Sequence, residues 1–71
     1  MEEVINLREE YIKLGQALKA AGFVEDGVEA KNEIQSGMVK VNDEVDLRRG
    51  RKLYEGDIVS YKGNKIIIKK Q

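Results

Sequence analysis

The stretch that decides the fold runs from Asp26 to Asn42 and reads DGVEAKNEIQSGMVKVN. Asp26 is followed three residues later by Glu29, a pairing typical of a capped helix N-terminus. Gly37 stands where a helix often ends on a left-handed residue. The spacing predicts a helix over residues 27–36. Its apolar stripe is expected to comprise Ala30, Ile34 and Met38.

After Met38 the hydrophobic period changes from that of a helix to that of a strand. Val39 and Val41 alternate with Lys40, and Asn42-Asp43 is a plausible two-residue turn because both residues tolerate positive φ. On the return strand we expect Val45 and Leu47 to face the core and Asp46 to face solvent.

A second helix is predicted upstream of this stretch. Leu14, Ala17, Leu18 and Ala21 form one apolar stripe, and Gly22 stands at the expected stop. The short connection to the next helix predicts a helix-turn-helix-like pair. Residues 3–8 alternate loosely and are interpreted as a short strand.

Downstream, the pattern predicts two further strands. Glu55-Gly56-Asp57 is a turn into a strand over residues 58–61, and Gly63-Asn64 is a second hairpin turn before a strand over residues 65–70. Each element has one apolar face, so the helix pair must lie on the sheet. The expected fold class is α+β: two short helices packed on a small antiparallel sheet, in a single domain over residues 1–71.

Length and composition exclude several function classes. The 71 residues contain no cysteine and no histidine, which removes disulfides, thiol nucleophiles, the usual general base and the commonest metal ligands. No carboxylates are paired at a spacing typical of catalysis. No apolar run approaches the length of a membrane span. We therefore expect a soluble, cytoplasmic, non-catalytic monomer without cofactor or metal.

The run from Leu47 to Leu53, LRRGRKL, carries the strongest functional signal. Residues 1–37 hold eight acidic and four basic side chains, whereas residues 38–71 hold five acidic and nine basic ones. A basic end on a chain of zero net charge suggests an anionic partner. Arginine matches phosphate oxygens bidentately, so the run is interpreted as a phosphate-contact loop. The alternative is a solvated loop neutralised by Asp46, Glu55 and Asp57.

Other candidates for anion or base contacts lie outside or beside this run. Lys31 is the one cation of the second helix, and its alternative is pairing with Glu29 or Glu33. Two further lysines extend the basic set: Lys13, at the start of the first helix, and Lys40, which is expected to face outward from its strand. Lys40 could also be an ordinary strand lysine. Tyr54 is the best tyrosine for stacking on bases, whereas Tyr61 is expected in the core. The candidate nucleic-acid-binding set is Lys13, Lys31, Lys40, Arg48, Arg49, Arg51, Lys52 and Tyr54.

Several of these pieces together resemble the S4-type RNA-binding domain. They are the helix with Leu14 and Leu18, then Val28-Glu29-Ala30-Lys31, and the strand Gly37-Met38-Val39-Lys40-Val41-Asn42. The run Arg48 to Leu53, followed by Gly56-Asp57, is similar to small stand-alone bacterial members. The match covers residues 12–59, followed by a C-terminal hairpin over residues 57–70. Many members have an arginine where this chain has Gly27 and an acid where it has Gly15.

The resemblance implies the S4-like (alpha-L) fold and binding of structured RNA, commonly ribosomal or transfer RNA. A stand-alone copy should bind rather than catalyse, and a role on the ribosome during its assembly is one expectation. Because the second helix has a single cation, we expect the loop from Arg48 to Lys52 to set RNA affinity. The alternative hypothesis is a protein-interaction adaptor that uses its acidic half to bind a basic partner.

Overall fold

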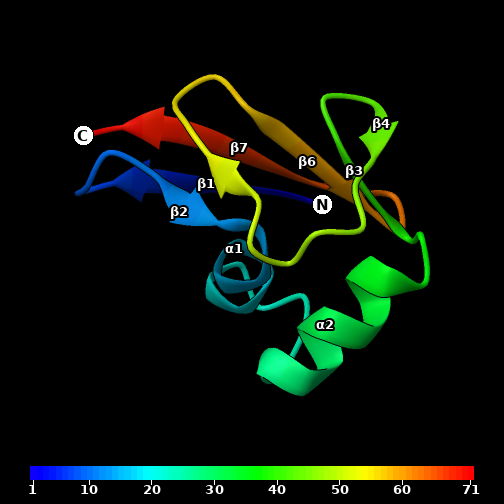
Figure 1. Cartoon of the computed structure of the whole chain (residues 1–71). Coiled ribbons are helices and arrows are strands. Elements are labelled where there is room, and N and C mark those ends of the chain that lie inside the picture. Colours follow the sequence, from blue (N-terminus) through cyan, green and yellow to red (C-terminus); the bar gives the residue numbers. More distant parts are fainter.

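The computed structural model describes all residues from Met1 to Gln71 and contains two helices and seven strands (Figure 1). The elements in chain order are β1 (Glu2–Leu7), β2 (Ile12–Lys13), α1 (Leu14–Ala20), α2 (Gly27–Gln35), β3 (Val39–Val41), β4 (Glu44–Val45), β5 (Lys52–Leu53), β6 (Ile58–Tyr61) and β7 (Asn64–Lys70). The predicted α+β class is confirmed, and so is the early strand.

The strands form two sheets. The larger has the order β1-β7-β6-β3-β4, and the smaller consists of β2 and β5. Every pairing is antiparallel except that of β1 with β7, which is parallel, so the larger sheet is mixed. The segment between β4 and β5 crosses from the edge of the larger sheet to the start of α1 (Figure 1). This crossing segment contains the basic run.

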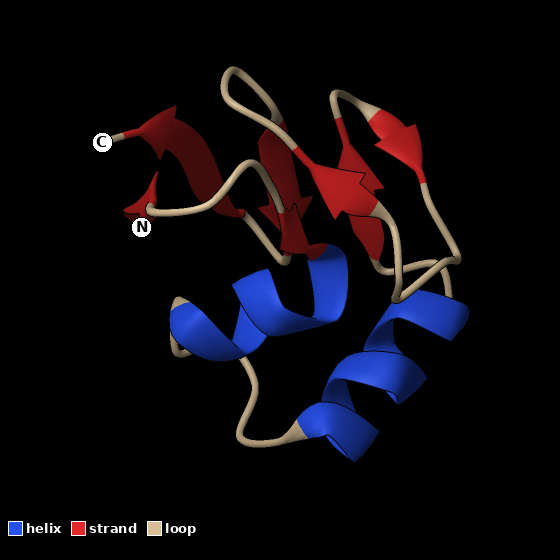
Figure 2. Ribbon diagram, turned by 60° about the vertical axis from the view of Figure 1, so that its left-hand side comes forward, coloured by secondary structure: helices blue, strands red, loops and turns tan.

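Both helices pack on one side of the larger sheet and enclose a single core (Figure 2). Leu14 and Leu18 of α1 and Ile34 of α2 are completely buried. From the strands the core takes residues of alternate positions, among them Val39, Val41, Val59, Tyr61, Ile66 and Ile68. The core position expected for Tyr61 is confirmed. Neither helix is both long enough and apolar enough to cross a membrane.

The helix ends follow the sequence signals. Asp26 accepts a 2.8 Å hydrogen bond from the Glu29 N–H, which caps α2 as predicted. Gly22 and Gly37 have φ of 80° and 83° and each is the left-handed residue that ends a helix. The Asn42-Asp43 turn is also confirmed, with φ of 51° and 70°.

Three local predictions are wrong. Met38 does not extend the stripe of α2, because the helix ends at Gln35 and Met38 is 46% exposed. The second hairpin turn is Lys62-Gly63 rather than Gly63-Asn64, since Asn64 already pairs with Tyr61. Val45 and Leu47 are exposed, whereas Asp46 is buried, which reverses the predicted orientation of the return strand. That reversal shapes the basic loop.

Candidate nucleic-acid interface

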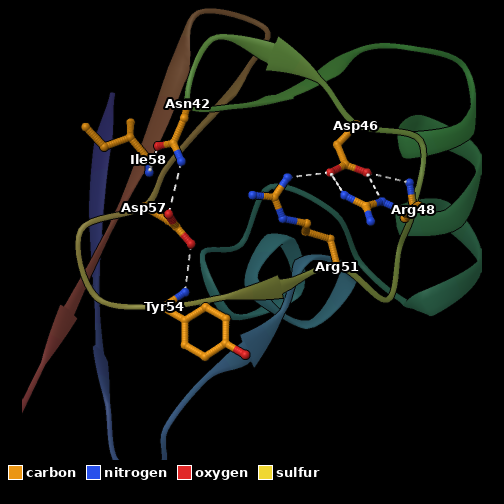
Figure 3. A network of polar contacts seen from close by, with 7 residues as sticks. All are labelled: Asn42, Asp46, Arg48, Arg51, Tyr54, Asp57 and Ile58. Carbon is orange, nitrogen blue, oxygen red and sulfur yellow. Dashed lines mark hydrogen bonds and ion pairs between the residues drawn. The ribbon is translucent and has the colours of Figure 1, made fainter.

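The Asp46 side chain lies between Arg48 and Arg51 of the basic run and binds both (Figure 3). Its carboxylate is 6% exposed and accepts hydrogen bonds from the backbone N–H, Nε and Nη2 of Arg48 at 2.9 to 3.0 Å. Arg51 donates a fourth hydrogen bond from Nη1 at 2.7 Å. The charge-assisted hydrogen bonds of Arg48 hold the pKa of Asp46 far below its usual range and outweigh the opposing effect of burial. One buried carboxylate thus fixes two arginines.

The backbone of the same loop caps α1. The Leu14 N–H donates to the Arg51 carbonyl at 2.8 Å, and the Gly15 N–H donates to the Arg49 carbonyl at 3.0 Å. Lys13, at the N-cap position, supplies no side-chain cap. The loop therefore satisfies amides that a helix start leaves without intrahelical partners. This contact fixes the basic run against α1.

Most of the predicted cations come together around this contact. Lys13 on β2 and Lys52 on β5 are direct cross-strand partners, and both are exposed. Like charges in such a pair are destabilising, so folding alone does not favour this arrangement. Arg48 still exposes 71% of its side chain despite its bond to Asp46. Arg49, Lys13 and Lys52 take part in no ion pair, because the three in the structure are Asp46–Arg48, Asp46–Arg51 and Glu33–Lys62.

Two exposed tyrosines flank the cations. The rings of Tyr11 and Tyr54 are 6.0 Å apart between centroids at an angle of 52°. The ammonium group of Lys52 lies 4.8 Å from the centre of the Tyr11 ring. The backbone of Tyr54 is fixed by a hydrogen bond from its N–H to Asp57, which also accepts from the Asn42 amide (Figure 3). The structure therefore places Tyr54 beside the basic loop, together with Tyr11.

The remaining two candidates lie apart from the loop. Lys31 is exposed on α2 and makes no ion pair, so the alternative pairing with Glu29 or Glu33 is not formed. Lys31 follows Gly27 by one helical turn of α2. Lys40 alternates with buried Val39 and Val41 and so points to the other side of the sheet. The structure does not bring Lys40 into the cluster.

Of the three acidic residues that could have neutralised the basic loop, only Asp46 pairs with its arginines. Asp57 bonds Asn42 and the Tyr54 N–H, and Glu55 forms no ion pair, so neither neutralises an arginine. Lys19 was considered beside Lys13 in the sequence, but Lys13 was favoured; in the structure Lys19 lies with Lys13 and Arg49 at one hollow. No group of three or more carboxylate, histidine or cysteine residues is placed to hold a metal ion.

A comparison with known proteins identifies the family of this chain. The family model described as S4 domain matches residues 5–69. The chain belongs to the S4 domain family.

Two curated relatives are small S4 domain proteins of similar length. One, from Bacillus subtilis (strain 168), is named "Probable ribosome maturation protein RlbA"; it is 48% identical over 63 residues, covering 89% of each chain. The other, from Escherichia coli (strain K12), is named "Putative RNA-binding protein YbcJ" and is 34% identical over 58 residues, covering 82% of this chain and 83% of the relative. The S4 domain match extends beyond the resemblance over residues 12–59 to include half of β1 and most of β7.

Proposed function

We propose that this protein is a monomeric, cytoplasmic, non-catalytic RNA-binding protein that docks on ribosomal or transfer RNA, with a role in ribosome assembly. Membership of the S4 domain family supports RNA as the partner, and the printed name of the Bacillus relative supports the ribosome. The observation that carries the proposal is the cross-strand pair of Lys13 and Lys52 beside the fixed basic loop.

Phosphate contacts supply the affinity in this proposal. Arg48, Arg49, Arg51 and Lys52 form the central contact surface, with Lys13 at its edge and Lys31 as an outlying contact; Lys40, which points to the other side of the sheet, is left out of this surface. Because Asp46 and the amides of α1 already hold the loop, less conformational entropy is lost when RNA binds. Recognition is mainly of backbone shape, since base edges of a regular RNA helix are poorly accessible to side chains.

Salt dependence tests this mechanism. If about four phosphates are engaged, log K should fall with log salt with a slope of roughly −3 to −4. Arg49→Ala should weaken binding to all structured RNAs and reduce that slope by about 1. Lys65→Ala is the matched control: it removes one exposed, unpaired cation from β7 and should leave both quantities unchanged. Salt-independent binding, or equal effects of the two variants, would contradict the proposal.

The adaptor alternative finds less support in the structure. Of the acidic side chains expected to bind a basic partner, Glu33 accepts a hydrogen bond from the Tyr61 hydroxyl and pairs with Lys62. Glu29 accepts from the Glu25 N–H. These carboxylates already have roles within the fold. Ribosome association that survives loss of the basic loop, but fails after neutralisation of Glu25, Glu29 and Glu33, would favour the adaptor.

A further inference from the structure

A hollow of about 310 Å³ lies between α1, the start of α2 and the basic loop. Three cations from two separate segments line it: Lys13 and Lys19 from the α1 segment, and Arg49 from the loop. Gly15, Gly27 and Gly50 form further parts of its wall, and no carboxylate lines it. The hollow is therefore positively charged, and the glycines in its wall leave space for a ligand.

The three cations are available to a ligand. None of them takes part in an ion pair, although the protein has as many acidic as basic residues. The nearby Asp26 carboxylate does not line the hollow and is bonded to the Glu29 N–H. Cations that converge on a concave site without a counter-charge repel one another, so an anion bound among them would relieve this repulsion.

The volume of the hollow and its position limit which anion it can hold. Its volume is at the lower end of the range for small-ligand sites, which suits one phosphate with its attached sugar rather than a stretch of duplex. Gly50 also lines the open depression formed by Arg48, Arg51 and Lys52, so the hollow adjoins the proposed phosphate-contact surface. A strand on that surface could thus turn one nucleotide into the hollow.

We propose that this hollow is a phosphate site for a single RNA nucleotide that departs from the regular helix. The inference rests on the proposed function, because it places the site within the RNA-binding surface. In an uninterrupted A-form helix each phosphate is held in line with its neighbours, so it reaches less far into a recess than the phosphate of a nucleotide that leaves the helix. The phosphate must belong either to a bulged nucleotide or to a strand end, and both present the same chemistry.

The test fills the hollow without changing charge. An added Cβ at Gly27 meets no atom within 4 Å, and the backbone there is not left-handed, so Gly27→Leu fits sterically and places bulk in the hollow. Val28→Leu is the matched control, since Val28 is the next residue of α2, is 69% exposed and does not line the hollow. Lys19→Ala is a second variant that removes a cation of the hollow and leaves the loop intact. Circular dichroism and urea unfolding check that each variant is folded.

Four RNA probes distinguish the outcomes: an uninterrupted hairpin, the same hairpin with a one-nucleotide bulge, and a single-stranded overhang with either a 5′-phosphate or a 5′-hydroxyl. We expect Gly27→Leu and Lys19→Ala to lose about tenfold in affinity for the bulged hairpin, the phosphorylated overhang or both, and little for the uninterrupted hairpin. The probe that is affected identifies the source of the phosphate. Val28→Leu should bind all four probes like the unchanged protein.

Two results would overturn the inference: unchanged affinity of Gly27→Leu for every probe, or a loss on the uninterrupted hairpin as large as the losses on the bulged hairpin and the phosphorylated overhang. In either case the proposed function survives if Arg48→Ala and Lys52→Ala, which lie outside the hollow, still weaken binding to every structured RNA. If the unchanged protein binds none of the probes, the proposed function itself fails.

Discussion

The Asp46 carboxylate accepts a 2.7 Å hydrogen bond from Nη1 of Arg51, five residues further along the chain. The same carboxylate binds Arg48, so it closes the basic loop into a fixed turn. The Arg51 carbonyl in turn receives the N–H of Leu14 at the start of α1. A single acidic residue within a basic run therefore couples the shape of the proposed RNA-binding surface to the stability of the fold.

Asp46→Asn should destabilise the protein although it leaves the side-chain shape almost unchanged. The substitution removes the negative charge that two arginines share, and we expect the free energy of unfolding to fall by about 1–2 kcal/mol, allowing for the exposure of Arg48. Urea denaturation measures this loss. Asp43→Asn makes the same charge change at an exposed turn residue and should shift stability by less than about 0.5 kcal/mol. Equal effects of the two would show that Asp46 has no special role.

The lowered pKa of Asp46 predicts acid sensitivity. Because its pKa in the folded protein is below its value in the unfolded chain, its stabilising contribution is complete above about pH 4. It is lost progressively as the pH falls toward the pKa of the folded state. When the free energy of unfolding is measured between about pH 6 and pH 2.5, it should fall less with decreasing pH in Asp46→Asn than in the unchanged protein. Parallel curves for the two proteins would contradict this assignment.

Local sequence signals were sufficient for both helices and for the strands of the larger sheet, but not for the short strands β2 and β5 or for the environment of Asp46. β4 comprises only Glu44 and Val45, and both are exposed, so this short edge strand has no core-facing residue of its own and the inward position belongs to Asp46 directly after it. Capping of α1 by loop carbonyls joins residues more than 30 positions apart, and no local pattern records it. The parallel pairing of β1 with β7 was missed for the same reason. The hairpin shift to Lys62-Gly63 arose because both dipeptides carry a turn-forming residue.

Asn42 supports the fold in two separable ways. It has a φ of 51°, and its side chain accepts from the Ile58 N–H at 2.9 Å and donates to Asp57 at 3.0 Å. Asn42→Gly keeps the backbone relaxed and loses the two hydrogen bonds, at a cost of about 1 kcal/mol because the site is exposed. Asn42→Ala adds about 1 kcal/mol of left-handed strain.

Thermal or urea unfolding should therefore rank stability as unchanged protein, then Asn42→Gly, then Asn42→Ala. Affinity for uninterrupted duplex RNA should be the same in all three, measured below their unfolding transitions, because Asn42 does not contact the basic loop. If Asn42→Ala is as stable as Asn42→Gly, the backbone strain does not contribute.

Tyr54 should contribute to RNA binding through its ring rather than its hydroxyl. The ring is 44% exposed beside Tyr11 and Lys52, and no hydrogen bond engages its hydroxyl. Stacking of an unpaired base on an aromatic ring contributes about 1–3 kcal/mol. Tyr54→Leu should thus weaken binding to RNA with an unpaired base by roughly tenfold or more, with little effect on uninterrupted duplex. Tyr54→Phe keeps the ring and should bind like the unchanged protein. Fluorescence anisotropy on the two RNAs separates these outcomes; if Tyr54→Phe lost as much affinity as Tyr54→Leu, the hydroxyl and not the ring would be the contact.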